Sequence, residues 1–369
     1  MEDSLKIFHL LCALALTSGI GCSTVSEPIL RAQPIQWPKR LPPKEITVTK
    51  RDGSIPFENF GRFGGCSLSG FEVHSSDGNA MVMATALSRV DPTDPVAIDG
   101  TTSKLTVTEN EDSFGRVALE SHRGDLPNGI IVYRPSAPKG TLFLLSSMNF
   151  LTKAENKLLD AFWQRGWQTV VIMPCLDLMR LTDETEKDAA NDFWGARIHS
   201  HLAERAYAAE AVWLWLSADH PELKSLPLAI CGVSLGALSA PAVALRLGDV
   251  DALVMIGGGA PVPTILATSS LNLLPKAITE NPHNFVARHL DSVSLDPGNV
   301  ASYLNDIPML LFDGRFDRIV PARCGDELYR ALGKPERWRY PFGHLLLVNA
   351  IMPLQRGRIA DWVEQAVSR

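Results

Sequence analysis

A serine flanked by glycines, in the pentapeptide Gly-Val-Ser-Leu-Gly at 232–236, restricts the fold of this chain more than any other feature. The apolar run at 226–231 is typical of a short buried strand, and the small-residue segment at 237–245 is typical of a helix. A strand, a sharp turn and a helix in succession place the Ser234 hydroxyl at an exposed apex. The pattern predicts a nucleophilic serine; the alternative is a glycine-rich strand–helix turn of another α/β protein.

Two later segments supply an acid and a base in a fixed order. A second buried-strand pattern at 307–312 is followed by Asp313 and, after a short turn, by Asp317. A further strand pattern at 337–340 ends shortly before His344. An imidazole can take a serine proton near neutral pH, and a carboxylate behind the ring fixes its tautomer. We therefore expect His344 to be the base, oriented by one of the two aspartates.

Nucleophile, acid and histidine in this order, each just beyond a strand, resemble the α/β-hydrolase superfamily, and the resemblance covers about residues 129–368. The family's acid turn, Gly-x-x-Asp-x-x-Val-Pro, is matched at 314–321 and favours Asp317 over Asp313. The resemblance implies an α/β fold, with a mostly parallel sheet covered by helices on both faces. It also implies catalysis by Ser234, Asp317 and His344 without a cofactor or a metal ion.

The expected oxyanion-binding loop departs from the commonest pattern of that family. Where many members carry His-Gly after the strand, this chain has Ser-Ser-Met-Asn-Phe at 146–150. We expect one donor to be the N–H of Leu235 and the other to be the N–H of Met148 or Asn149. An alternative role for Asn149 is donation from its side chain, or capping of the helix that follows.

Composition bounds the class of protein. The 369 residues carry a net charge of −6 and are 46% hydrophobic, which is typical of a globular protein with an ordinary core. No long basic block interleaves with aromatic residues, so no nucleic-acid partner is expected. No clustered Cys/His spacing matches a structural zinc site. The expected partner is a small-molecule ester, and the oligomeric state stays open.

The N-terminus predicts export. An apolar run at 7–15 is too short to span a bilayer and precedes small residues, which is typical of a cleaved signal segment at 1–21. Gly21-Cys22 resembles a bacterial lipoprotein cleavage site, although Gly19 stands where leucine is usual and Lys6 is the only basic residue before the apolar run. We expect a lipid on Cys22 and a location in the bacterial cell envelope, lipid-anchored or periplasmic. The alternative is an uncleaved, weakly apolar segment.

Three parts are expected along the chain after the signal. Residues 22–44 are rich in proline and predict an extended tether, and 45–128 predict a β-rich extension. Residues 129–369 alternate strand and helix, with a cap insertion at about 261–306.

Four cysteines remain once Cys12 and Cys22 are set aside: Cys66, Cys175, Cys231 and Cys324. An even number in an exported protein permits a disulfide without proving one. Cys231 lies in a predicted strand and Cys175 follows another, which predicts buried thiols.

These features together predict a serine hydrolase that cleaves a carboxylic ester, because an alkoxide leaves more readily than an amine. Two alternatives stay open. One is a peptidase or amidase of the same fold, and the other is an inactive, envelope-associated binding lipoprotein.

Overall fold

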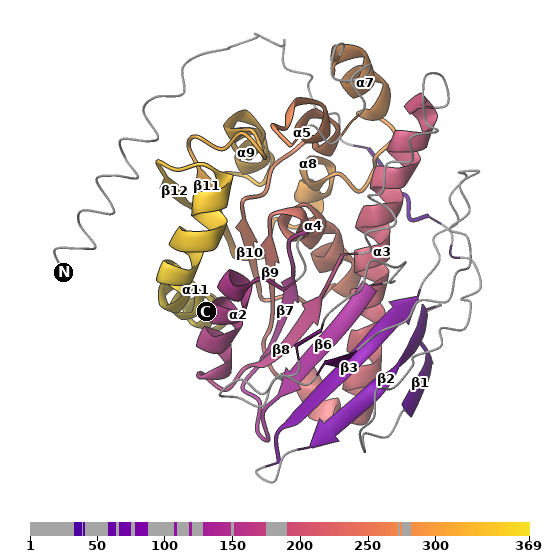
Figure 1. Ribbon diagram of the computed structural model, residues 1–369, viewed down its shortest axis with the longest axis vertical. Helices are drawn as coiled ribbons and strands as arrows, with labels where there is room; N and C mark the ends of the chain where they lie inside the picture. Colours follow the sequence, from indigo (N-terminus) through magenta and orange to yellow (C-terminus); the bar gives the residue numbers. More distant parts are fainter. Residues whose placement is uncertain are drawn as a thin grey trace, which may run out of the picture.

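The computed structural model describes residues 33–38, 40, 58–63, 66–74, 78–87, 107–108, 118–119, 128–148, 151–174, 190–271, 274 and 282–369. Within these residues, ten strands form one sheet, and a separate pair, β4 (Val107–Thr108) and β5 (Ala118–Leu119), forms a second (Figure 1). The strands of the large sheet are β1 (Glu58–Phe63), β2 (Cys66–His74), β3 (Ala80–Leu87), β6 (Asn128–Arg134), β7 (Thr141–Leu145), β8 (Gln168–Ile172), β9 (Leu228–Val233), β10 (Ala252–Ile256), β11 (Met309–Gly314) and β12 (Glu336–Tyr340).

The strand order across the large sheet is β1-β2-β3-β6-β8-β7-β9-β10-β11-β12. The pairings from β1 to β8 are antiparallel, and every pairing from β8 to β12 is parallel. From β3 onwards this order, with β8 and β7 exchanged relative to the chain, is that of the α/β-hydrolase fold. The predicted fold class is confirmed.

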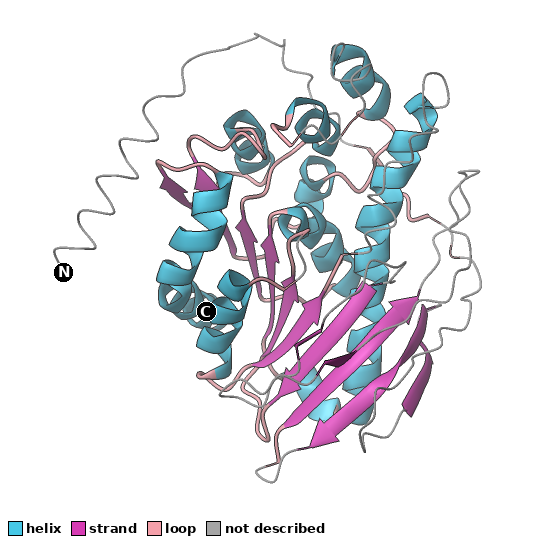
Figure 2. Ribbon diagram, in the orientation of Figure 1, coloured by secondary structure: helices cyan, strands magenta, loops and turns pink. Residues whose placement is uncertain are grey.

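Helices cover both faces of this sheet (Figure 2). On one face α2 (Lys153–Trp163) and α11 (Met352–Val367) pack beside each other, and on the other lie α3 (Ala190–Asp219), α4 (Leu235–Leu247) and α9 (Ala322–Ala331). Alternate side chains of β7 lie on opposite faces of the sheet. Leu142 and Leu144 pack with α2 and α11, whereas Phe143 and Leu145 pack with α3 and α4. Strands buried on both faces are therefore apolar throughout, which is why the short runs were recognisable.

The shorter helices complete the domain. They are η2 (Pro221–Ser225), α5 (Val262–Thr268), α7 (Pro282–His289), α8 (Pro297–Val300), η3 (Ala301–Tyr303), α10 (His344–Leu346) and η4 (Leu347–Ile351). The predicted cap at 261–306 thus contains α5, α7, α8 and η3.

The β-rich N-terminal region extends the sheet that β6 to β12 form. β3 pairs with β6 along its whole length, from Ala80↔Arg134 to Ala86↔Asn128. Helix α3, 30 residues long, reaches across these strands, so that Cys66 and Leu68 share one core with Tyr207. The described part of 45–128 therefore adds strands and core to the domain that follows it.

Residues 33–38 and Arg40, expected in the tether, pack against α3 and the cap. The Gln33 N–H donates to Asn299 Oδ1 at 2.7 Å, and the Tyr207 hydroxyl donates to the Pro38 carbonyl at 2.7 Å. The Trp37 and Tyr207 rings lie 5.5 Å apart. Part of the proline-rich segment is therefore docked on the domain.

The signal segment 1–21 and Cys22 lie outside the described residues. In the part of the chain that the structure describes, no helix is both long and apolar enough to cross a membrane.

Three of the four remaining cysteines lie in the described region, and all three are buried. Cys231 is the buried thiol that its strand predicted, and burial raises its pKa. Burial likewise raises the pKa of Cys324 to about 12. The Cys66 thiol donates to the Tyr207 carbonyl at 3.4 Å. Cys175 lies outside the described residues.

Candidate active site

Ser234 lies in a sharp turn between β9 and α4 with φ 54° and ψ −114°, a backbone conformation that L-residues rarely adopt. Its N–H donates to the Ile256 carbonyl at 2.7 Å, which ties the turn to β10. A Cβ on Gly236 would lie 1.9 Å from the Leu145 carbonyl oxygen, and one on Gly232 would lie 2.5 Å from the Gly236 carbonyl oxygen. Both flanking glycines are therefore required for the chain to pass this turn.

His344 begins the C-terminal helical segment, as the first residue of α10. Its Nε2 lies 2.7 Å from Ser234 Oγ, and its Nδ1 lies 2.7 Å from Asp317 Oδ2. Gly257, with φ +67°, packs against the ring: a Cβ there would lie 2.9 Å from His344 Cε1. The structure therefore brings the three predicted residues into one hydrogen-bonded row.

The Asp317 carboxylate is fixed on its other side by backbone. Its Oδ1 accepts from the N–H groups of Ile319 and Val320, each at 2.9 Å. Asp317 is buried, as is His344, so neither carboxylate oxygen depends on solvent for its partners. This arrangement holds Oδ2 in the direction of the histidine ring.

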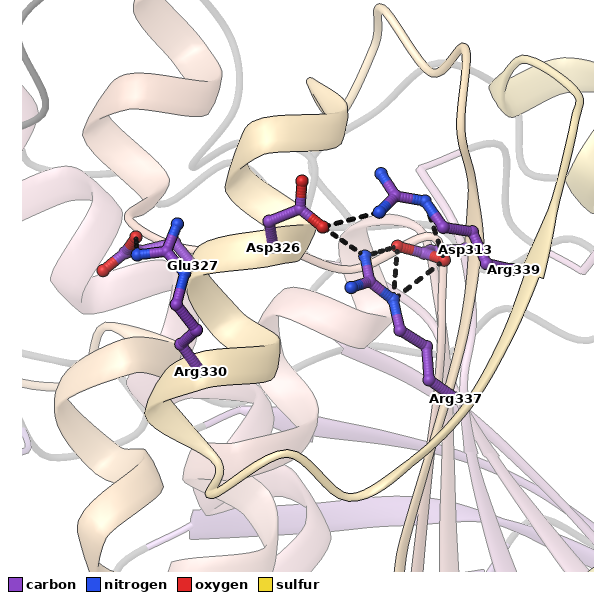
Figure 3. Close-up of polar contacts among 6 residues, drawn as sticks. All are labelled: Asp313, Asp326, Glu327, Arg330, Arg337 and Arg339. Atoms are coloured by element: carbon purple, nitrogen blue, oxygen red, sulfur yellow. Dashed lines mark hydrogen bonds and ion pairs between the residues drawn. The ribbon is translucent and has the colours of Figure 1, made fainter.

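The alternative acid, Asp313, is committed to a different interaction. It lies within β11, not beyond it, and Arg337 Nε lies 3.3 and 3.2 Å from its two carboxylate oxygens. Figure 3 shows Arg337 between Asp313 and Asp326. The Asp326 carboxylate also pairs with Arg339, at 2.7 Å. This cluster joins β11, β12 and α9. The carboxylate that lies behind His344 is that of Asp317, the aspartate that the sequence favoured, whereas Asp313 is paired with Arg337.

The expected oxyanion donors are placed in part. Leu235 is the first residue of α4, so its N–H has no acceptor within the helix. Met148 is half-buried in the turn after β7, and Asn149 lies outside the described residues. The N-cap of α2 is Thr152, whose hydroxyl accepts from the Glu155 N–H at 3.2 Å, and so Asn149 is not the cap. The role of Leu235, Met148 and Asn149 as oxyanion donors stays a prediction.

The two histidines of α3, and His220 directly after it, lie in surroundings of their own. His199 Nε2 lies 3.1 Å from Ser294 Oγ, and His220 lies 3.4 Å from the Glu222 carboxylate. His201 is fully buried, and burial, with the positive charges of α3 arginines, lowers its pKa to about 3. Among the described residues, no three His, Cys, Asp or Glu side chains are grouped as a metal site.

Two residues at the site were not recognised from the sequence. Gly257 was expected only as part of a glycine loop, because its contact with His344 joins distant segments. Glu155 accepts from the Ser147 N–H at 2.7 Å and from the Thr152 N–H at 2.7 Å. The spacing Thr-x-x-Glu at 152–155 is a capping-box signature that could have indicated its helix contact, but not the contact with Ser147.

Neither a protein-family model nor a curated protein sequence matches this chain significantly. Solved structures are similar at low identity. An esterase from Pyrococcus furiosus is 13% identical, with 74% of this chain and 98% of that chain covered and a TM-score of 0.44. Est1E from Butyrivibrio proteoclasticus is 13% identical, with coverages of 71% and 99% and a TM-score of 0.44. A putative dienelactone hydrolase from Klebsiella pneumoniae is 16% identical, with coverages of 66% and 95% and a TM-score of 0.42. The likeness concerns the fold alone.

Proposed function

We propose that this protein is a serine hydrolase that cleaves a carboxylic ester through an acyl-enzyme. The row Asp317–His344–Ser234, with 2.7 Å at each step, is the observation that carries the proposal. It joins a nucleophile on a strained turn to a base whose other nitrogen meets a buried carboxylate. These are the requirements for activating a hydroxyl that is otherwise a poor nucleophile.

The reaction begins when Ser234 Oγ attacks the ester carbonyl carbon while its proton passes to His344 Nε2. Asp317 stabilises the imidazolium that forms and keeps the ring in the orientation needed. The carbonyl oxygen becomes an oxyanion, which accepts hydrogen bonds from the N–H groups of Leu235 and Met148. Collapse of this intermediate expels the alkoxide, which takes the proton from Nε2 and leaves as the alcohol.

Water completes the cycle. His344 takes a proton from a water molecule, which attacks the acyl carbon, and the second oxyanion uses the same donors. Ser234 Oγ leaves with the proton returned by Nε2, and the carboxylic acid is released. No step requires a cofactor or a metal ion. An ester is proposed because its alkoxide leaves more readily than an amine.

A fluorophosphonate probe tests the nucleophile. The wild-type protein should be labelled, and Ser234→Ala should not, with its fold retained by circular dichroism. Ser239→Ala is the matched control, since Ser239 is a buried serine on α4, the helix that follows Ser234, and its hydroxyl donates to the Leu235 carbonyl. Equal labelling of wild type and Ser234→Ala would reject the assignment.

A substrate panel tests the reaction class. Short acyl esters of nitrophenol should turn over faster than matched thioesters and amides. Faster amide cleavage would favour a peptidase or amidase. Absence of turnover across all three, with no labelling, would favour an inactive binding protein.

We further propose that a lipid on Cys22 holds the protein at the bacterial cell envelope. Gln33 is docked on the domain, and the residues between Cys22 and Gln33 reach at most about 40 Å when fully extended. The domain would therefore stay close to the membrane surface. Radiolabelled palmitate should be incorporated by the wild type and not by Cys22→Ser. Recovery of the chain in the cytoplasm with Met1 retained would reject both export and lipidation.

A further inference from the structure

The peptide group that joins Ser146 to Ser147 is held at both ends by buried charged side chains. Arg205 Nη2 donates to the Ser146 carbonyl oxygen at 2.6 Å, and Glu155 Oε1 accepts from the Ser147 N–H at 2.7 Å. Arg205 and Glu155 are each 0% exposed. Because the carbonyl and N–H of a trans peptide point in opposite directions, the two side chains approach from opposite sides.

The two side chains also come from opposite faces of the sheet. Arg205 belongs to α3, and Glu155 belongs to α2, the helices whose apolar residues pack against the two faces. The peptide they hold follows directly after β7, at the carboxyl edge of the sheet.

Glu155 does more than a helix cap requires. In a capping box the glutamate returns to the N–H of the N-cap residue, and here Oε2 accepts from the Thr152 N–H at 2.7 Å. Its second oxygen reaches Ser147, before the helix begins. Burial raises the pKa of Glu155, whereas these N–H donors act in the opposite direction. An exposed glutamate could cap the helix without the cost of burying the carboxylate.

The held peptide precedes the one that bears the Met148 N–H. The end of β7 also touches the first turn of α4, since a Cβ on Gly236 would lie 1.9 Å from the Leu145 carbonyl oxygen. That turn carries the Leu235 N–H. An oxyanion hole requires two donors held at a fixed spacing before the reaction begins. Fixing the Ser146–Ser147 peptide fixes the start of the segment that carries the second donor.

We propose that Glu155 and Arg205 are positioning residues that hold the backbone of Ser147 and Met148 for oxyanion binding. The proposal rests on the hydrolase function proposed above. Neither side chain touches the substrate. Both act through one peptide group, one on its N–H and the other on its carbonyl.

Glu155→Gln is the principal test, with a nitrophenyl ester as substrate. A glutamine oxygen can accept from only one of the two N–H groups, and its NH₂ opposes the other. Because the donors act on the transition state, kcat should fall about 10- to 100-fold while KM changes less than about threefold. The rate of fluorophosphonate labelling should fall in parallel.

Thr152→Ala is the matched control. It removes the acceptor of the Glu155 N–H at the same helix end and leaves both carboxylate contacts in place. It should lower the melting temperature and leave kcat within about twofold of the wild type. If Glu155→Gln keeps the wild-type kcat, or if Thr152→Ala loses as much, the positioning role is rejected.

Arg205→Lys tests the other end of the peptide, and it also serves if Glu155→Gln fails to fold. Its kcat should fall several-fold with KM little changed, because an ammonium lacks the planar reach of the guanidinium. An unchanged kcat would overturn the role of Arg205.

The double variant of Glu155→Gln and Arg205→Lys should lose little more kcat than the more severe single variant, since both substitutions act on one peptide group. Additive losses would contradict a shared action. If the wild type itself neither labels nor turns over, the hydrolase proposal fails and this inference fails with it.

Discussion

Arg337 donates from Nε to both carboxylate oxygens of Asp313, at 3.3 and 3.2 Å, and thereby ties that aspartate to the neighbouring strand β12. Asp317 instead directs one oxygen to His344 Nδ1 at 2.7 Å. Two aspartates four residues apart thus have separate tasks. One joins strands and helix, and the other orients the ring beside Ser234.

Asp317→Asn should lower kcat by about three to four orders of magnitude. The amide NH₂ facing Nδ1 favours the tautomer with the proton on Nε2, which cannot accept the Ser234 proton. Steady-state turnover of a nitrophenyl ester measures the loss. Retention of more than a tenth of the activity would show that the histidine does not depend on this carboxylate.

Asp313→Asn is the companion variant. It should keep kcat within a few-fold of the wild type and lower the free energy of unfolding by about 1–3 kcal/mol, because Arg337 loses a buried charged acceptor. Urea unfolding measures the stability. The reverse ranking of the two variants in kcat would return the acid role to Asp313.

Local patterns in the sequence predicted the elements but not all of their neighbours. The strands before Ser234 and Asp313 were recognised from apolar runs, although β9 and β11 each begin and end two residues later than predicted. Consequently Asp313 lies inside its strand, where Arg337 of the next strand can reach it. A strand pattern specifies one buried segment and leaves its partner open, so the pairing of β3 with β6 was not foreseen.

Contacts between segments distant in the sequence could not be predicted either, because a local pattern does not specify its partner. Arg205 meets the Ser146 carbonyl across 59 positions of sequence, and nothing in either local pattern indicates the pair. The docking of Trp37 on Tyr207 was likewise not predictable from composition, because a proline-rich segment can be extended and still pack on a domain. The order Ser234, Asp317, His344 could be predicted from the sequence because each residue follows a recognisable strand pattern.

Gly257→Ala should displace His344. A Cβ at this position would lie 2.9 Å from the ring, and φ +67° adds backbone strain. We expect kcat to fall about 10- to 100-fold, as expected for a misplaced catalytic group. Gly248→Ala is the matched control, because its φ of +84° imposes similar strain with nothing within 4 Å of the added Cβ. It should lower stability by about 1 kcal/mol and leave kcat unchanged. Equal kcat losses in both variants would attribute the effect to strain alone.

The docked segment at 33–38 should contribute to stability. Trp37 packs against the Tyr207 ring, and the Arg246 guanidinium lies 4.9 Å from the Trp37 ring centroid and 5.0 Å from that of Tyr207. Trp37→Ala should lower the free energy of unfolding by about 1–3 kcal/mol, since a half-buried aromatic loses its packing. Removal of residues 1–32 is the control and should leave the unfolding midpoint of the remaining chain unchanged. A midpoint for Trp37→Ala equal to that of the wild type would show that the docking contributes nothing.

Asp296 should make stability depend on pH. This buried carboxylate accepts from the Val262 N–H at 2.6 Å and from the Gly298 N–H at 2.9 Å, and burial raises its pKa from 3.8 to about 6. Between these values the folded state holds a proton that the unfolded state has lost, so the contribution of Asp296 falls as pH rises towards 6. Asp296→Asn does not titrate. The wild type should therefore gain roughly 1 kcal/mol relative to Asp296→Asn when pH is lowered from 7 to 5, measured by urea unfolding at both values. A constant difference, or one that shrinks on acidification, would mean that Asp296 is ionised in the folded protein throughout this range.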